Sequence, residues 1–174
     1  MRGRDQRPGQ PLRRRRAKGG APEEPGDHAL GRSRGGYGTK IVLVTDGHGH
    51  PLSAVLLPGQ AHESTALEPA LRAVRIGRRT RPGRLAGDKG FSYPRVRRWL
   101  RRRRIAPVIP TRSDQRPDPG FDREAYRGRN VIERCVGWLK ENRRLGTRYE
   151  KLAGSFLAMV KLAIIRRYLR LLGP

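Results

Sequence analysis

Residues 41–57 read IVLVTDGHGHPLSAVLL, and the fold follows from this stretch. Two apolar runs, 41–44 and 52–57, stand on either side of Asp46-Gly47-His48-Gly49. β-Branched and aliphatic residues favour strands, while Asp and Gly favour the tight turns that join antiparallel strands. The pattern therefore predicts an antiparallel hairpin that ends at Pro58-Gly59.

Downstream of the hairpin, helical and strand patterns alternate. Apolar residues in 64–76 recur at spacings of three and four, which predicts an amphipathic helix. Residues 85–87 and 106–110 read as short strands, and 94–104 as a helix with a proline in its first turn. Two further helices are expected, one from Glu124 or Asn130 to about residue 145 and one over 151–172. This order predicts a mixed α/β sheet covered by helices.

The composition is strongly basic. The 174 residues include 40 Lys and Arg against 15 Asp and Glu, a formal net charge of +25 and a pI of about 11.7. The electric field of so large a positive charge favours a polyanion as partner, and nucleic acid is the leading candidate. The alternative is a coding bias toward Arg, Gly and Pro that raises the charge without a binding role.

The same composition excludes several other classes of protein. No stretch approaches the roughly 20 apolar residues of a membrane span, so no membrane partner is expected. Cys135 is the only cysteine, which excludes a disulfide framework and indicates a buried packing residue. The N-terminus lacks the apolar segment of a secretory signal, so a cytoplasmic, nucleoid-associated location is expected.

The chain divides near residue 38. Residues 1–38 have no apolar periodicity and contain four consecutive arginines at 13–16, so we expect a disordered basic arm or loop there. Residues 39–174 are expected to form the folded domain.

Asp88 is the first candidate for chemistry, because acidic residues are scarce here. It stands at the carboxyl end of the predicted strand 85–87 and precedes a glycine turn. Open α/β sheets bind ligands at the carboxyl ends of their strands, so Asp88 is well placed to hold a metal ion. The alternative is an aspartate that only caps the next turn.

Glu133 is the second candidate. On a helix, Tyr126, Arg129, Glu133 and Lys140 fall within about 60° of one another. Glu133 is then expected at the edge of the buried face, where a carboxylate is costly unless it is paired or bound to a metal. The alternative is a simple pair with Arg129 at a spacing of i, i+4.

Histidines are weaker candidates. His48 and His50 lie in the hairpin turn, where metal ligation is one interpretation and plain solvent exposure the other. His62 is expected to cap a helix, to make a local hydrogen bond, or to lie at the rim of an active site.

The spacing Tyr126-x2-Arg129-x3-Glu133-x6-Lys140 matches the YREK signature without a gap. Asp88-Lys89-Gly90-Phe91 matches a second motif of the same family, and the turn at 58–64 is similar to its strand-to-helix connection. On these motifs, residues 26–172 resemble the C-terminal portion of bacterial insertion-sequence transposases of the DDE type.

The resemblance implies an RNase H-like catalytic domain over 39–174. It implies that Asp88 and Glu133 are the second and third of three carboxylates that hold two Mg²⁺ or Mn²⁺ ions, which suit oxygen ligands. The implied function is DNA transposition through metal-dependent strand cleavage and strand transfer at transposon ends and target DNA. Lys140 would contact DNA phosphate, and Tyr126 and Arg129 would support the helix and the DNA.

The first catalytic aspartate of the family stands on a central strand upstream of residue 26. Asp5 is followed by prolines that a central strand excludes, and Asp27 and Asp46 lie in a loop and a turn. We therefore expect a sheet that lacks its first, central strand, with another polypeptide, such as an upstream-frame transposase product, or a homo-oligomer as partner. Two alternatives are a non-catalytic basic DNA- or RNA-binding protein and a regulatory transposase remnant.

Overall fold

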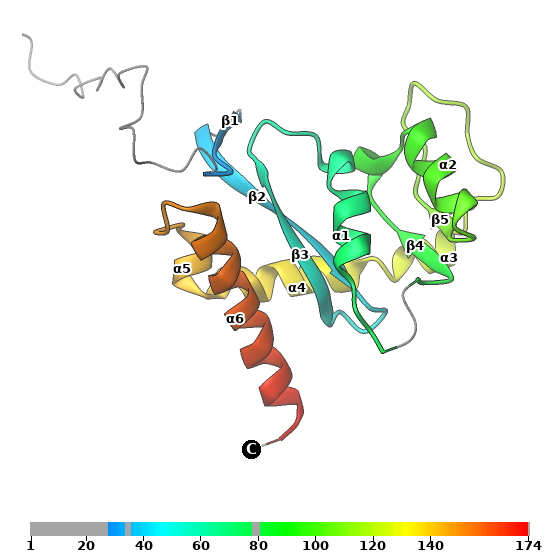
Figure 1. The fold of residues 1–174 in the computed structure, drawn as a ribbon. Coiled ribbons are helices and arrows are strands. Elements are labelled where there is room, and N and C mark those ends of the chain that lie inside the picture. The colour runs from blue at the N-terminus through cyan, green and yellow to red at the C-terminus, as the bar shows by residue number, and fades with distance from the viewer. Residues whose placement is uncertain (1–27, 34–35, 78–80, 174) are drawn as a thin grey trace, which may run out of the picture.

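The predicted hairpin forms the centre of the fold. The computed structural model describes residues 28–33, 36–77 and 81–173. In it β2 (Gly36–Thr45) pairs antiparallel with β3 (Pro51–Pro58), with Ile41 opposite Leu56 and Leu43 opposite Ala54 (Figure 1). The antiparallel hairpin expected from residues 41–57 is thus confirmed.

Alternation along the two strands gives the hairpin two apolar faces. Ile41, Leu43, Ala54 and Leu56 pack into one core cluster with α4 (Asn130–Glu141), α5 (Arg143–Gly146) and α6 (Ala153–Leu171). This cluster buries Leu139, Leu145, Phe156, Val160 and Ala163.

The opposite face of the hairpin packs against α1 (Leu67–Ala73). Val44 joins a second core cluster there, and the buried Ser53 donates its hydroxyl hydrogen bond to the Ala70 carbonyl at 2.7 Å. That bond satisfies a polar group that would otherwise be costly to bury. In Figure 1 the hairpin accordingly lies between α1 and α6.

The second cluster continues into a smaller parallel pair beyond α1. β4 (Arg84–Ala86) pairs with β5 (Ala106–Val108), and α2 (Pro94–Arg102) connects them. Pro94 stands in the first turn of α2, where its missing N–H costs nothing. The side chains that this cluster buries are Leu67, Leu71, Val96, Leu100, Ile105 and Ile109.

Short elements complete the order. β1 (Gly31–Ser33) precedes β2, the 3-10 helix η1 (Glu63–Thr65) precedes α1, and η2 (Lys89–Phe91) follows β4. α3 (Arg123–Arg127) leads into α4. The mixed α/β architecture is confirmed, and none of the helices in the described part of the chain is long and apolar enough to cross a membrane.

β1 and the start of β2 differ from the sequence prediction, which placed all of residues 1–38 in an arm or loop. Gly31 pairs with Gly38, and Ser33 pairs with Gly36. This segment has no apolar alternation, so its strands are held by backbone hydrogen bonds that a side-chain pattern does not reveal. Residues 1–27 of the predicted arm lie outside the described residues.

The strands form two sheets, with the orders β1-β2-β3 and β4-β5. Within the described residues, the stretch of β2 from Thr39 to Thr45 pairs with β3 alone, and β4 pairs with β5 alone. Val44 of β2 and Leu85 of β4 nevertheless pack against the same core cluster. The two sheets therefore share a core without a direct hydrogen-bonded connection.

Asp46 organises the turn of the hairpin. Its Oδ1 accepts from the backbone N–H groups of His48 and His50, each at 2.9 Å, and its Oδ2 lies 2.9 Å from His50 Nδ1. Burial raises the pKa of Asp46, but the hydrogen bonds from His50 and His48 outweigh it and hold the pKa below its ordinary value. The structure therefore shows His50 as a hydrogen-bond partner of Asp46.

We predict that Asp46→Ala destabilises the fold by about 1 kcal/mol near neutral pH, because two backbone donors lose their acceptor. A lowered folded-state pKa means that the ionised carboxylate stabilises the fold above pH 3.8 and loses this effect as the pH falls further. The gap between wild type and variant should therefore narrow below pH 3.8. Urea denaturation over a pH series measures it, and Glu141→Ala, at an exposed site, is the control.

Candidate catalytic site

Asp88 lies where the sequence predicted it, just past the carboxyl end of β4. The Gly87 N–H donates to the Val108 carbonyl at 3.2 Å, which extends the parallel pairing by one residue. Asp88 then caps η2, and its Oδ1 accepts from the Gly90 N–H at 2.8 Å. The strand-end position and the turn cap are therefore both present, and the cap uses one of the two carboxylate oxygens.

Glu63 lies beside Asp88, although the sequence analysis did not single it out. A Cβ at Gly90 would stand 2.9 Å from Asp88 Oδ1 and 3.8 Å from Glu63 Oε2, so the two carboxylates flank this glycine. Lys40 of β2 pairs with Glu63 at 3.5 Å. The only sequence signal for Glu63 was its place in the turn at 58–64.

Glu133 is on α4, but the expected edge-of-core environment is wrong. Its side chain is 62% exposed and pairs with Arg129. The residues that α4 buries are Cys135 and Leu139, which lie about 200° and 240° around the helix from Glu133. The buried face is narrower than the apolar pattern suggested, and Glu133 points away from it.

Three of the four signature residues contact one another. Tyr126 is on α3, and the Arg129 guanidinium lies 5.5 Å from the centroid of its ring. The same guanidinium pairs with Glu133, so Arg129 links the other two. Gly128 and Arg129 keep helical backbone angles between α3 and α4, which preserves the expected spacing across the break.

Lys140 stands apart from this group. It is exposed in the last turn of α4, seven residues after Glu133, which corresponds to about 10 Å along the helix axis. A cation at this end of a helix is favoured by the helix dipole. Among the residues that the structure describes, no carboxylate pairs with its ammonium group, which can therefore meet an external anion.

Cys135 is a buried thiol, as predicted. Burial raises its pKa, an effect that the Coulombic field of Arg167 opposes. A raised pKa keeps the thiol protonated and unreactive, which fits a packing role rather than a nucleophile.

Over residues 28–33, 36–77 and 81–173, no group of three or more His, Cys, Asp or Glu side chains is placed to hold a metal ion. Asp88 is engaged with Gly90, and Glu133 is engaged with Arg129. The described residues thus provide separate carboxylates and not a closed ligand set.

Comparison with known proteins identifies the family. Residues 9–167 match the family described as the Transposase DDE domain. The chain belongs to this DDE transposase family. The match confirms the resemblance read from the YREK spacing, and it extends into residues before 28 that the structure does not describe.

The DDE transposase domain also has a curated relative. The protein assigned as transposase of insertion sequence element IS402 in Burkholderia cepacia is 37% identical over 131 residues. The match covers 72% of this chain and 60% of the relative, so the chain spans about three-fifths of the relative's length. No solved structure matches the chain.

We predict that the cap of η2 depends on the Asp88 oxygen and not on its charge. Asp88→Asn keeps an acceptor for the Gly90 N–H and should leave the free energy of unfolding nearly unchanged. Asp88→Ala removes the acceptor and should cost about 1 kcal/mol. Urea denaturation compares the two variants, and an equal loss in both would contradict this role.

Proposed function

We propose that this chain acts in DNA transposition as part of an insertion-sequence transposase. In this proposal residues 39–174 form an RNase H-like catalytic domain that cleaves and joins DNA strands. The observation that carries the proposal is the family match, together with the placement of Asp88 just past β4 and Glu133 on α4.

Asp88 and Glu133 would supply two of the carboxylates that hold Mg²⁺ or Mn²⁺. Carboxylate oxygens are the ligands that these hard cations prefer, so the donor chemistry fits. Bound ions of this kind activate an attacking water or 3′-hydroxyl and stabilise the leaving oxygen at phosphorus. Asp88 is already held at a fixed orientation by the Gly90 N–H, while Glu133 must exchange its Arg129 partner to reach a cation.

The third carboxylate would come from a second polypeptide. The unpaired edges of β2 and β4 border the same core cluster, since Val44 and Leu85 both contact it. A strand added between these edges would join the two sheets into one by backbone hydrogen bonds. An aspartate on that strand would complete the ligand set.

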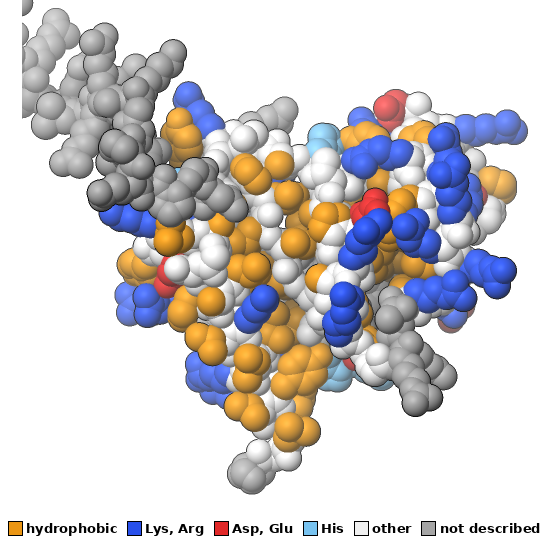
Figure 2. All heavy atoms as spheres, in the orientation of Figure 1, with side chains coloured by type: hydrophobic (Ala, Val, Ile, Leu, Met, Phe, Trp, Pro, Cys, Tyr) orange, Lys and Arg blue, Asp and Glu red, His pale blue; other side chains and the backbone are white. Residues whose placement is uncertain are grey.

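The outer face of α2 supports a role in binding DNA. Arg97, Arg98, Arg101 and Arg102 line one hollow of about 470 Å³, with Pro94 and Gln115 at its margin. Arg98, Arg101 and Arg102 are exposed and lie within about 100° of one another around the helix, while Arg97 at the inner margin is mostly buried. Figure 2 shows Lys and Arg side chains gathered at the end of the molecule that holds α2.

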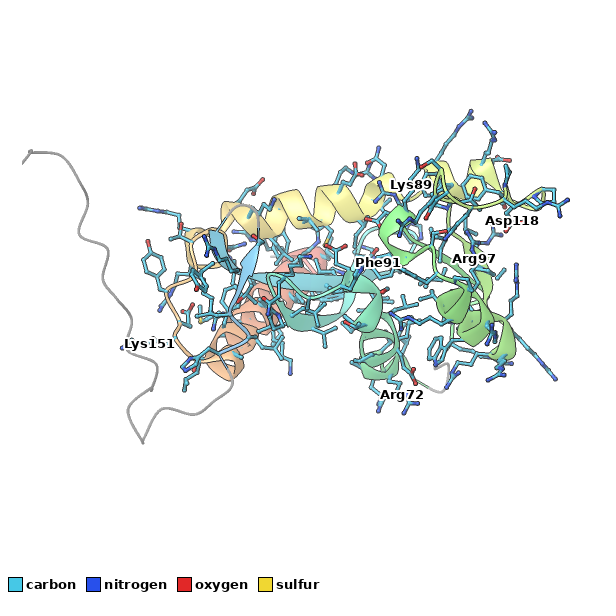
Figure 3. The ribbon with its side chains drawn as sticks, turned by 90° about the horizontal axis from the view of Figure 1, so that it is seen from above. Arg72, Lys89, Phe91, Arg97, Asp118 and Lys151 are labelled. Atoms are coloured by element: carbon cyan, nitrogen blue, oxygen red, sulfur yellow. The ribbon has the colours of Figure 1, made fainter. Side chains whose placement is uncertain are left out.

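Most of these arginines have no acidic partner. Arg97 pairs with Asp118 at 3.4 Å, and Figure 3 shows the two side chains in the part of the fold beyond α1. Across the ranges that the structure describes, no acidic side chain pairs with Arg98, Arg101 or Arg102. Unpaired guanidinium groups in a hollow suit the phosphates of a nucleic-acid backbone.

A second candidate function is binding of nucleic acid without catalysis. The exposed Arg129–Glu133 pair favours it, because this pair explains the position of Glu133 without a metal. The two candidates differ in what removal of the Glu133 charge does to metal binding and strand cleavage.

We predict that Asp88→Asn and Glu133→Gln each weaken Mn²⁺ binding to the purified chain at least threefold and abolish any Mn²⁺-dependent nicking of supercoiled DNA that it shows. Each variant removes one negative charge from a site that has few ligands. Electron paramagnetic resonance of free Mn²⁺ measures binding even where nicking is slow. Glu141→Gln, at another exposed acid of α4, is the matched control and should resemble wild type. Equal Mn²⁺ affinity and equal nicking in all four proteins would exclude this catalytic role and leave the binding function.

We also predict that Lys140→Gln weakens DNA binding and lowers the slope of log affinity against log salt by about one, the signature of one lost phosphate contact. Arg129→Gln should weaken DNA binding too, while costing less than about 1 kcal/mol of stability because its ion pair with Glu133 is exposed on the Glu133 side. Fluorescence anisotropy over a salt series, with thermal unfolding alongside, measures both effects. A Lys140→Gln slope identical to wild type would remove Lys140 from the interface.

A further inference from the structure

His62 and Tyr93 connect two segments that border Asp88. His62 precedes η1 and Tyr93 precedes α2, yet neither side chain caps its helix. Instead the Tyr93 hydroxyl lies 2.9 Å from His62 Nε2, and the two rings meet edge to face at 5.3 Å between centroids. The hydrogen bond is exposed, so an outside group can reach it.

Two arginines flank the Tyr93 ring. The guanidinium carbons of Arg95 and Arg112 each lie 5.7 Å from the ring centroid. Arg112 also donates to the Tyr93 hydroxyl at 3.3 Å, and Arg95 donates to the buried Ser64 hydroxyl at 2.7 Å. These contacts already hold both guanidinium groups beside the Tyr93 ring. Binding of a ligand there would therefore cost little further side-chain conformational entropy.

The cluster formed by His62, Tyr93, Arg95 and Arg112 keeps excess positive charge. The Arg112 Nε pairs with Asp114 at 3.2 Å, and its Nη1 donates to the Tyr93 hydroxyl. In the described part of the chain, no carboxylate pairs with Arg95, which leaves a full positive charge there. A stabilising contact between protein segments needs the His62–Tyr93 bond alone, not two guanidinium groups around it.

The cluster and Asp88 are connected to the same two short helices, η1 and η2. The Tyr93 N–H donates to the Phe91 carbonyl at 2.8 Å, and Phe91 ends the short helix that Asp88 caps. From the other side, Glu63 follows His62 and reaches within 3.8 Å of the Cβ position of Gly90. The donors of the cluster and the Asp88 carboxylate thus border the same two short helices.

We propose that His62, Tyr93, Arg95 and Arg112 bind a backbone phosphate of DNA and position the strand next to Asp88. This inference rests on the proposed function and assigns these four as positioning residues. A phosphate offers charged acceptor oxygens, which match the Arg112 and Arg95 N–H groups and whichever donor, phenol O–H or imidazole N–H, is not used in the Tyr93–His62 hydrogen bond. It is also repelled by Asp88 and Glu63 nearby, so a strand stays beside these carboxylates only where cationic donors hold it.

The test is DNA affinity in EDTA, which separates binding from any metal-dependent step. A short fluorescein-labelled duplex is titrated with wild type, Arg95→Gln, Arg112→Gln and Tyr93→Phe, and binding is followed by anisotropy over a salt series. We expect each arginine variant to weaken binding about tenfold and to lower the salt slope by about one. Tyr93→Phe removes a donor without a charge, so it should weaken binding about threefold and leave the slope unchanged.

The matched control is Arg72→Gln, which removes the same charge from an exposed arginine of α1. Arg72 pairs with Glu68, and in Figure 3 it lies at the opposite edge of the view from Lys89. Its effect should be less than twofold. His62→Gln retains an N–H donor and should bind more tightly than His62→Ala, whereas thermal unfolding should be similar in both.

The proposal is overturned when the two arginine variants lose no more affinity than Arg72→Gln, or when Tyr93→Phe binds like wild type. Neither result changes the prediction for Mn²⁺ binding by Glu133→Gln, which tests the catalytic role by itself. Conversely, a Glu133→Gln protein that matches wild type in Mn²⁺ binding and nicking would end the catalytic role and leave a DNA contact at Tyr93 intact. The two failures are therefore distinguishable.

Discussion

The antiparallel pairing of β2 and β3 is the constraint on which the rest of the fold depends. Its two-residue alternation sends Ile41 and Leu56 to one core cluster, and Val44 to the other, where Ser53 bonds to α1. Glu133 is on α4, which packs in the first cluster, and Asp88 follows β4, which packs against the second. A one-residue slip of the hairpin register would exchange its faces and uncouple these two layers.

Sequence patterns predicted the parts of the fold that rest on side-chain periodicity. The hairpin, α2 behind Pro94 and the two long C-terminal helices were all found within a few residues of the expected positions. β1 was missed because backbone pairing between glycines leaves no apolar alternation to detect. Glu133 was placed too near the core because the buried face of α4 is narrow: the apolar Ile132 and Val136 beside it are only partly buried.

The candidate site also has a part that the sequence predicts and a part that it does not. Asp88 was predictable because a strand followed by Asp and Gly is a local pattern, and the YREK spacing lies on nearly continuous helical backbone. The Tyr93–His62 contact joins residues 31 positions apart through two short segments without periodicity. Its partners Arg95 and Arg112 come from a helix start and a loop. Only the packing of η1 against η2 brings these side chains together, and that packing is a tertiary property.

The distribution of charge says more about function than its total. A coding bias toward arginine predicts cations scattered without regard to the fold, yet several arginines here have defined partners: Arg97 holds Asp118, and Arg129 holds both Tyr126 and Glu133. Those without an acidic partner in the described ranges of the chain include three that line the hollow on α2 and Arg95 beside Tyr93. Since like charges repel when brought side by side, such groupings reduce the stability of the isolated domain. Their persistence near Asp88 and across α2 is accounted for when a polyanion lies over both surfaces and removes that repulsion.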